Sequence, residues 1–288
     1  LAGGIGSIKE VQIKKGVPQA GDVVIVLGGP AMLIGLGGGS ASSTKKTNDN
    51  ADLDFASVQR SNPEMQRRAQ QVLDKFNERS SKNPITFIHD VGAGGISNAI
   101  PELAKDTNLG VEINLENIDS ADQTMSPMEL WCNESQERYV FTIPMKKLRA
   151  LEDICRKERC PFSIAGYLTE DKIIKIKFHE DEIVNLHLDD LFGEIPLPDL
   201  IAQNYDRSTA REDLPSSDLQ SLIFNVLNYP AVGSKKFLIT IGDRTVNGLV
   251  FRDQLIGNRQ IPVSDYAATL DDYGAVSGQV FSIGEKPN

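Results

Sequence analysis

Short apolar runs and helical spacings alternate along the first 178 residues. Apolar runs bounded by turn residues predict strands, and apolar residues that recur every three or four positions predict amphipathic helices. The expected strands are 23–27, 84–88, 111–115, 140–143, 162–168 and 172–178. Helices are expected from Pro63, from Ile96 and from Pro144, with an irregular acidic loop over 116–130. This order predicts an α+β domain closed by a hairpin of its last two strands.

The helix that starts near Pro63 has the clearest signals. Ser61 and Asn62 are candidate N-caps, and Ser61 and Glu64 have the spacing of a capping box. The apolar positions of this helix are Met65, Ala69, Val72, Leu73 and Phe76. Their helical spacing predicts a single apolar face.

After residue 178 the pattern changes. Residues 179–234 are acidic and carry four prolines, which indicates a connector with a short helix over 219–227. New strands are expected over 237–241 and 245–251. The sequence therefore predicts a first domain over 1–178, a connector over 179–234 and the beginning of a second domain over 235–288.

Composition and charge exclude several classes of protein. The chain has 288 residues, 40% hydrophobic residues and a net charge of −10, which argues against a broad nucleic-acid-binding surface. The three cysteines form no CxxC pair, and their odd number suits a reducing cytoplasm. No apolar run approaches the roughly 20 residues of a membrane span. Because the chain begins with Leu1, we expect it to be a piece of a longer protein.

Two glycine-rich stretches follow predicted strands. Gly28–Ser43 follows the strand over 23–27, and a second glycine-rich turn over 91–95 follows Asp90. A strand that runs into such a loop can present backbone N–H groups to a phosphate or carboxylate. The first stretch lacks the GK[ST] ending of a P-loop and the GxGxxG context of a dinucleotide fold. Ligand contact and simple turn packing both remain open for it.

Candidate site residues lie beside these turns and near the end of the chain. Asp90 ends a strand, where it is either a metal ligand or a cap for the following backbone N–H groups. His89 is expected to be a wall or core residue. The polar cluster Glu134–Gln136 is either a solvated loop or a hydrogen-bonding recognition segment. Asp265 likewise ends an apolar stretch.

Five segments together resemble the large, single-chain phosphoribosylformylglycinamidine synthase (FGAM synthase) family of purine biosynthesis. They are LGGPAMLIGLGGGSASS (27–43), DLDFASVQRSNPEMQRR (52–68), FIHDVGAGGISNAIPEL (87–103), MSPMELWCNESQERYV (125–140) and TIGDRTVNGLVFRDQ (240–254). The resemblance covers the chain almost from end to end and is weakest over 179–234.

The resemblance implies an aminoimidazole-ribonucleotide-synthetase C-terminal-like domain, a connector and the start of an N-terminal-like α/β synthetase domain. The remaining synthetase domains and the glutaminase would be partners on the same chain. The family's catalytic histidine and glutaminase triad have no counterpart here, so no catalytic residue is assigned. The family is an ATP-dependent carbon–nitrogen ligase that converts formylglycinamide ribonucleotide (FGAR), glutamine and ATP into formylglycinamidine ribonucleotide, ADP, phosphate and glutamate. This piece alone is expected to be inactive.

The resemblance also assigns roles to individual residues. Four positions fall where family members contact FGAR: Gln59, Glu134, Ser135 and Gln136. Asp90 falls at a magnesium ligand, and Asp265 at a magnesium ligand of an auxiliary site that holds ADP. Ser264 falls beside a nucleotide contact of that site. Two alternatives remain: a non-catalytic nucleotide-binding or scaffold module, and a related synthetase that acts on thiamine phosphate or selenide.

Overall fold

The computed structural model describes residues 8–36, 62–78, 83–135, 137–193, 218–239 and 248–284. Contacts divide the chain into two units, one of residues 8–197 and one of residues 198–288 with 1–7. Each unit is considered by itself. Among the described residues, none of the helices combines the length and apolar character needed to cross a bilayer.

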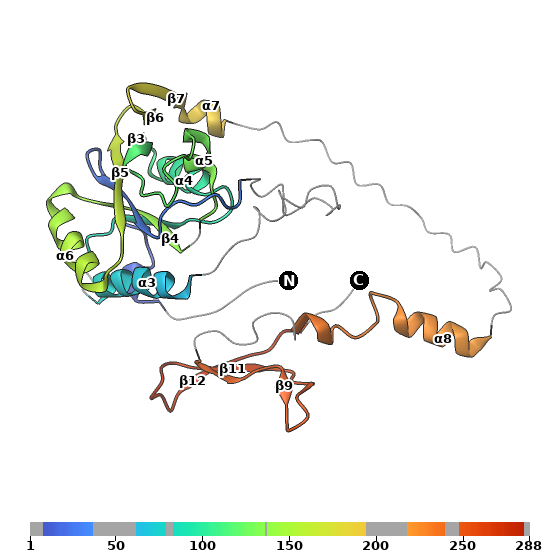
Figure 1. Cartoon of the computed structure of the whole chain (residues 1–288). Helices are drawn as coiled ribbons and strands as arrows, with labels where there is room; N and C mark the ends of the chain where they lie inside the picture. Colours follow the sequence, from blue (N-terminus) through green and yellow to red (C-terminus); the bar gives the residue numbers. More distant parts are fainter. Residues whose placement is uncertain are drawn as a thin grey trace. The chain divides into compact units, whose positions relative to one another are not determined.

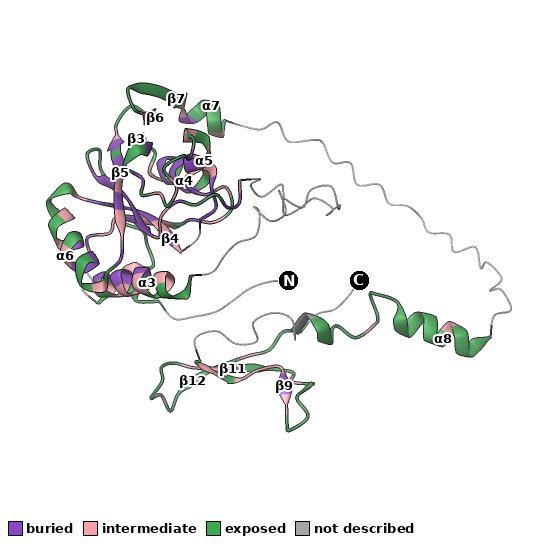
Figure 2. Cartoon of the chain, viewed as in Figure 1, coloured by how far each residue is buried: buried purple, intermediate pink, exposed green. Residues whose placement is uncertain are grey.

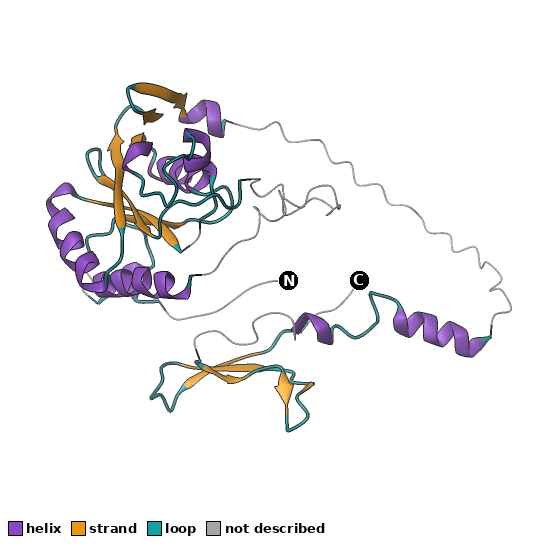
Figure 3. Cartoon of the chain, viewed as in Figure 1, coloured by secondary structure: helices purple, strands orange, loops and turns teal. Residues whose placement is uncertain are grey.

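The first unit is built on a seven-stranded mixed sheet (Figures 1 and 3). Its strands are β1 (Val23–Gly28), β2 (Phe87–Asp90), β3 (Gly110–Asn114), β4 (Arg138–Ile143), β5 (Phe162–Thr169), β6 (Ile173–Phe178) and β7 (Asp181–His187). Their spatial order is β2-β4-β1-β5-β3-β6-β7. Neighbouring strands are antiparallel except β3 and β6, which are parallel. The structure thus confirms the expected α+β class.

Both faces of the central strand β1 are covered, which explains its unbroken apolar run. Alternate side chains point to opposite faces of a strand. Val23, Ile25 and Leu27 pack with α3 (Pro63–Asn77) and α6 (Leu148–Glu158). Val24 and Val26 belong to the core of the other face. That face is covered by α4 (Ile96–Thr107), α5 (Pro127–Cys132) and α7 (Leu188–Phe192).

Local capping signals set the helix starts. Asn62 caps α3, and its side chain accepts a hydrogen bond from Met65 N, while Ser61 lies outside the described residues. The expected loop over 116–130 is wrong in part, because it contains the 3₁₀ turn η4 (Leu115–Asn117) and the start of α5. Ser126 and Glu129 form a full capping box at α5. The S-x-x-E spacing of these two residues is a capping-box signal that is present in the sequence.

The expected hairpin of the last two strands is wrong. β5 pairs with β1 along one edge and with β3 along the other, so no edge is left for β6. β6 instead pairs with the far edge of β3. Residues 181–192, expected as connector, form β7 and α7, and β7 extends the sheet by pairing with β6.

Smaller 3₁₀ turns complete the first unit: η1 (Glu10–Gln12) near its start and η5 (Met145–Lys147) before α6. The expected helix from Pro144 therefore begins as a 3₁₀ turn, and Arg159 ends it in the left-handed conformation.

The second unit contains α8 (Leu219–Asn228), which confirms the helix expected over 219–227. Its strands are β8 (Val250–Arg252), β9 (Leu255–Ile256), β10 (Ile261–Pro262), β11 (Ala267–Leu270) and β12 (Gly278–Phe281). β12, β11 and β8 form one sheet, and β9 and β10 form a hairpin. The strand expected over 237–241 is wrong where the chain is described, because Lys236–Ile239 is the 3₁₀ helix η6. A short apolar run does not distinguish a strand from a helix by periodicity.

Candidate functional site

Strand topology brings three segments to one end of the first sheet. β1 and β2 flank β4, and both run antiparallel to it. The register pairs Gly28 with Arg138 and Asp90 with Tyr139. The loops that leave β1 and β2 therefore meet the segment that enters β4. We call them the first glycine loop (28–36), the second glycine turn (91–95) and the arch (133–138, described except for Gln136).

The first glycine loop lies directly against the arch. Met32 N donates to Ser135 Oγ at 2.9 Å, and Glu134 N donates to Ile34 O at 2.9 Å. Gly35 has a φ of +69°, and a Cβ built on it would lie 2.3 Å from Glu134 Cβ. Only glycine allows this approach. Within the described part of the loop, the glycine makes room for the arch.

The second glycine turn holds the Glu134 carboxylate. Gly94 N donates to Glu134 Oε1 at 2.8 Å. Gly95 has a φ of +64° and is the N-cap residue of α4, and a Cβ on it would lie 2.0 Å from Asn133 O. A helix N-terminus favours a negative charge. Backbone N–H groups of a glycine-rich turn can hold a phosphate or a carboxylate, and the group found at this turn is the carboxylate of Glu134 from the protein itself.

Glu134 and Ser135 are consequently buried, at 6% and 2% exposure, instead of forming a solvated loop. Arg138, the first residue of β4, is buried beside them. Burial lowers the pKa of the Arg138 guanidinium to about 10, opposed by the charge of Glu137. It stays protonated at neutral pH, so the site combines a buried carboxylate with a buried cation.

Asp90 lies at the same end of the sheet but faces solvent, with 77% of its side chain exposed. Among the described residues no backbone N–H donates to its carboxylate, so the capping role is not found there. His89 is half-buried, with Nε2 2.6 Å from Glu102 Oε2 and Nδ1 2.7 Å from Asp90 O. Both ring nitrogens are thus engaged, as expected of a wall residue.

The described residues contain no group of three or more His, Cys, Asp or Glu side chains that is arranged to hold a metal ion. Mg²⁺ is often held by one or two protein carboxylates, with substrate phosphates and water as its other ligands, so a single exposed carboxylate such as that of Asp90 is chemically compatible with this ion.

The remaining predicted residues lie elsewhere or outside the described chain. Ser264 and Asp265 belong to the second unit, between β10 and β11. Ser264 Oγ donates to Tyr266 O at 2.6 Å, and Asp265 is exposed. Gln59 and Gln136 lie outside the described residues.

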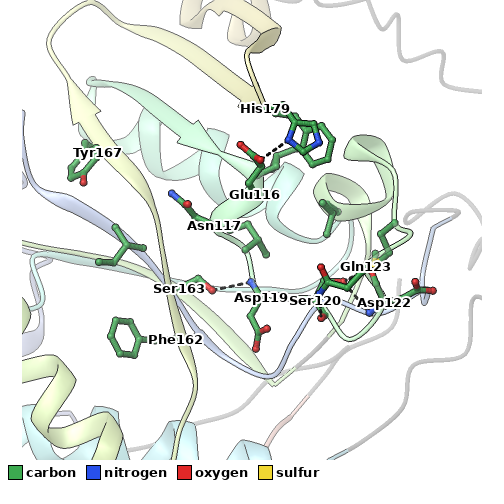
Figure 4. A pocket seen from close by; sticks show the side chains of 16 residues that line it. Glu116, Asn117, Asp119, Ser120, Asp122, Gln123, Phe162, Ser163, Tyr167 and His179 are labelled. Atoms are coloured by element: carbon green, nitrogen blue, oxygen red, sulfur yellow. Dashed lines mark hydrogen bonds and ion pairs between the residues drawn. The ribbon is translucent and has the colours of Figure 1, made fainter.

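A cavity of about 910 Å³ is lined by residues that follow β3 and by residues of β5 (Figure 4). Ala31 N donates to Asp119 O, and Asp119 N donates to Ser163 Oγ, which joins the cavity wall to the first glycine loop. Glu116 and Asp122 also line it. Three carboxylates in one lining disfavour a phosphate ligand. Sequence reasoning missed both this cavity and Arg138, since neither has a local signal beyond a charged residue at a strand start.

Two family descriptions match the chain. "AIR synthase related protein, C-terminal domain" matches residues 19–179, and "FGAR-AT PurM_N-like domain" matches residues 234–288.

Solved structures with the same fold include three from Thermotoga maritima. PurL complexed with FGAR is 21% identical, with a TM-score of 0.57, and the match covers 68% of this chain and 32% of that chain. PurLQS is 17% identical, with a TM-score of 0.58, over 89% of this chain and 36% of that chain. PurL complexed with ADP is 17% identical, with a TM-score of 0.55, over 91% of this chain and 37% of that chain. The chain thus spans about a third of the length of each of these three chains.

Proposed function

The chain belongs to the AIR synthase related family, and from this membership we propose that it is part of an FGAM synthase. The proposed reaction joins nitrogen from glutamine to FGAR with hydrolysis of ATP. PurL structures with FGAR, ATP and ADP support this assignment. The complete reaction is proposed for the longer enzyme, and the 288 residues alone are expected to be inactive.

The observation that carries the proposal is the burial of Glu134 and Ser135 where both glycine segments meet. We propose that these two side chains contact FGAR, together with Gln59 and Gln136. A carboxylate accepts hydrogen bonds from ribose hydroxyls, and a serine hydroxyl both donates and accepts. Glu134 repels phosphate, so its partner on FGAR is a hydroxyl or amide group.

Asp90 is proposed as a Mg²⁺ ligand beside this site. The ion would supply charge neutralisation for phosphoryl transfer to the FGAR amide oxygen. The chain's own part is to present a solvent-facing carboxylate at the end of β2. Asp265 and Ser264 are proposed to serve a second, ADP-holding nucleotide site in the second unit.

Calorimetry of FGAR binding to the full-length enzyme tests the proposal. Ser135→Ala should weaken FGAR binding about tenfold, the effect of one buried hydrogen-bonding group. Ser221→Ala on exposed α8 is the matched control and should bind like wild type. Equal affinity in both variants would contradict the FGAR role of Ser135. If the wild-type enzyme binds ADP but shows no FGAR binding at all, a non-catalytic nucleotide-binding module is favoured instead.

The isolated 288 residues provide a second test. Amidine formation from FGAR, ATP and ammonia is expected to be absent, because no catalytic residue is assigned to this segment. Turnover by the isolated segment would overturn that assignment.

A further inference from the structure

Two buried side chains that have no proposed role so far, Asn133 and Arg138, hold the arch in place. Asn133 is fully buried, and its Nδ2 donates to Glu129 O at 2.7 Å and Leu130 O at 2.8 Å, two carbonyls in the last turn of α5. Its Oδ1 accepts from Ser135 N at 3.3 Å and from Arg138 Nη2 at 2.9 Å. Asn133 therefore uses its full hydrogen-bonding capacity to join α5 to the arch.

Arg138 braces the arch from the sheet side. Its Nε donates to Ser135 O at 2.7 Å, and its Nη2 donates to Asn133 O at 3.3 Å as well as to Oδ1. Arg138 belongs to β4, where it pairs with Gly28 of β1. Its side-chain bonds therefore fix the backbone of Asn133 and Ser135, on both sides of Glu134, relative to the sheet. The Glu134 side chain is then free to reach Gly94 N, and Ser135 Oγ to reach Met32 N.

The burial of the Arg138 guanidinium is expected to lower the stability of the fold. Arg138 is 2% exposed, and no carboxylate among the described residues forms an ion pair with it. Its Nη1 has no hydrogen-bond partner there. A buried cation without an ion-pair partner is costly to a fold, even where a neighbouring charge such as that of Glu137 acts on it, and a hydrophobic residue of similar volume is often as stable or more stable. Such a group is most easily understood as a constraint set by the site.

We propose that Arg138, acting through Asn133, is the positioning residue that sets Glu134 and Ser135 against the two glycine segments. It does so without touching substrate. The choice of FGAR as the ligand rests on the proposed function, whereas the positioning of Glu134 and Ser135 by Arg138 concerns the arch alone.

The test compares Arg138→Lys with Val72→Ala in the full-length enzyme. Lysine keeps the charge but cannot reproduce the two-pronged contact of Nε and Nη2. Val72 is buried in α3 on the opposite side of the sheet from α4, so its truncation is a stability control outside the site. Hydrogen exchange is followed in peptides that contain Met32, Gly94 and α3, and FGAR affinity is measured by calorimetry.

Arg138→Lys should speed exchange at the Met32 and Gly94 peptides and weaken FGAR binding, each by about tenfold, with α3 unchanged. Val72→Ala should do the reverse, loosening α3 and leaving FGAR affinity intact. If Arg138→Lys lowers the unfolding temperature but leaves hydrogen exchange in the Met32 and Gly94 peptides as slow as in wild type, the proposal is overturned. Absence of FGAR binding in wild type would reject the proposed function, and the exchange data would still decide the positioning role.

A second variant, Arg138→Met, keeps the test decisive if Arg138→Lys fails to fold. It removes the buried charge and every brace contact at similar volume, so the fold is expected to persist. Faster exchange at Met32 and Gly94 supports the proposal, and unchanged exchange there overturns it.

Discussion

The two units of the chain place the same kinds of apolar residues in different surroundings. In the first unit, the apolar residues of β1 are buried on both faces of the sheet. In α8 of the second unit, Leu219 is 70% exposed and Phe224 is 56% exposed, and no residue of this helix is buried. Figure 2 shows this contrast in colour. Periodicity therefore predicts that an element forms, whereas burial depends on the layers that pack on it.

Truncation of a large apolar side chain should separate the two units most strongly. Phe141→Ala empties a fully buried position of β4 and should cost about 3–5 kcal/mol of unfolding free energy. Phe224→Ala removes the same atoms from exposed α8 and should cost less than about 1 kcal/mol. Denaturant unfolding of the 288-residue chain, followed by the fluorescence of its one tryptophan, Trp131, measures the first unit. Circular dichroism follows α8. A large loss of α8 helix in Phe224→Ala would show that Phe224 is covered.

Asp90 and Asp265, the two exposed carboxylates that are proposed as Mg²⁺ ligands, give the next largest contrast. In the full-length enzyme, Asp90→Asn should lower turnover about 100-fold, as expected when a group that stabilises transferring charge is lost. The unfolding temperature should change little, because the Asp90 side chain faces solvent. Asp265→Asn should reduce ADP retention more than turnover. Steady-state kinetics across Mg²⁺ concentrations measures the turnover of both variants, and the nucleotide content of the purified enzymes measures ADP retention. Unchanged turnover of Asp90→Asn at saturating Mg²⁺ would contradict a ligand role.

Much of the first unit was predictable because its signals are local. The strand β1 and two candidate caps of α3, Ser61 and Asn62, were read from adjacent residues, and Asn62 is the cap in the structure. The failed hairpin of β5 and β6 shows the limit, because alternation reports which residues face a core but not which strand occupies each edge. β3, about fifty residues earlier in the chain, occupies that edge. Long-range pairing of this kind has no local signature.

The candidate site shows the same division. Glu134 and Ser135 were singled out as a polar cluster before a strand, and the structure adds their burial. The contact between Gly94 N and the Glu134 carboxylate joins residues forty positions apart, and spacing alone did not indicate it. Arg138 was missed because a charged residue beside a polar loop is usually solvated. Its burial follows only from the tertiary packing around β4.

Glycine substitutions test the close contact between the second glycine turn and the arch. Gly95 and Gly21 both have positive φ angles, +64° and +87°, so alanine is strained at either position. At Gly95 the new Cβ would also collide with Asn133 O, whereas at Gly21 nothing lies within 4 Å. Gly95→Ala should therefore cost about 1–3 kcal/mol more than Gly21→Ala. Trp131 fluorescence during denaturant unfolding measures the difference. Equal losses would mean that the arch moves freely away from the turn.

The smallest expected effect concerns two carboxylates that cap helices, one in each unit. The backbone N–H and hydroxyl of Ser126 lower the pKa of Glu129, and the hydroxyl and backbone N–H of Ser221 lower the pKa of Asp218. A carboxylate with a lowered pKa in the folded state stabilises fully above its ordinary pKa, and this contribution is lost as pH falls through the folded value. Glu129→Gln should therefore reduce the acid sensitivity of the unfolding midpoint reported by Trp131, which lies in the same helix, α5. Asp218→Asn should leave that midpoint unchanged, and an equal change in both variants would show that the two units unfold together.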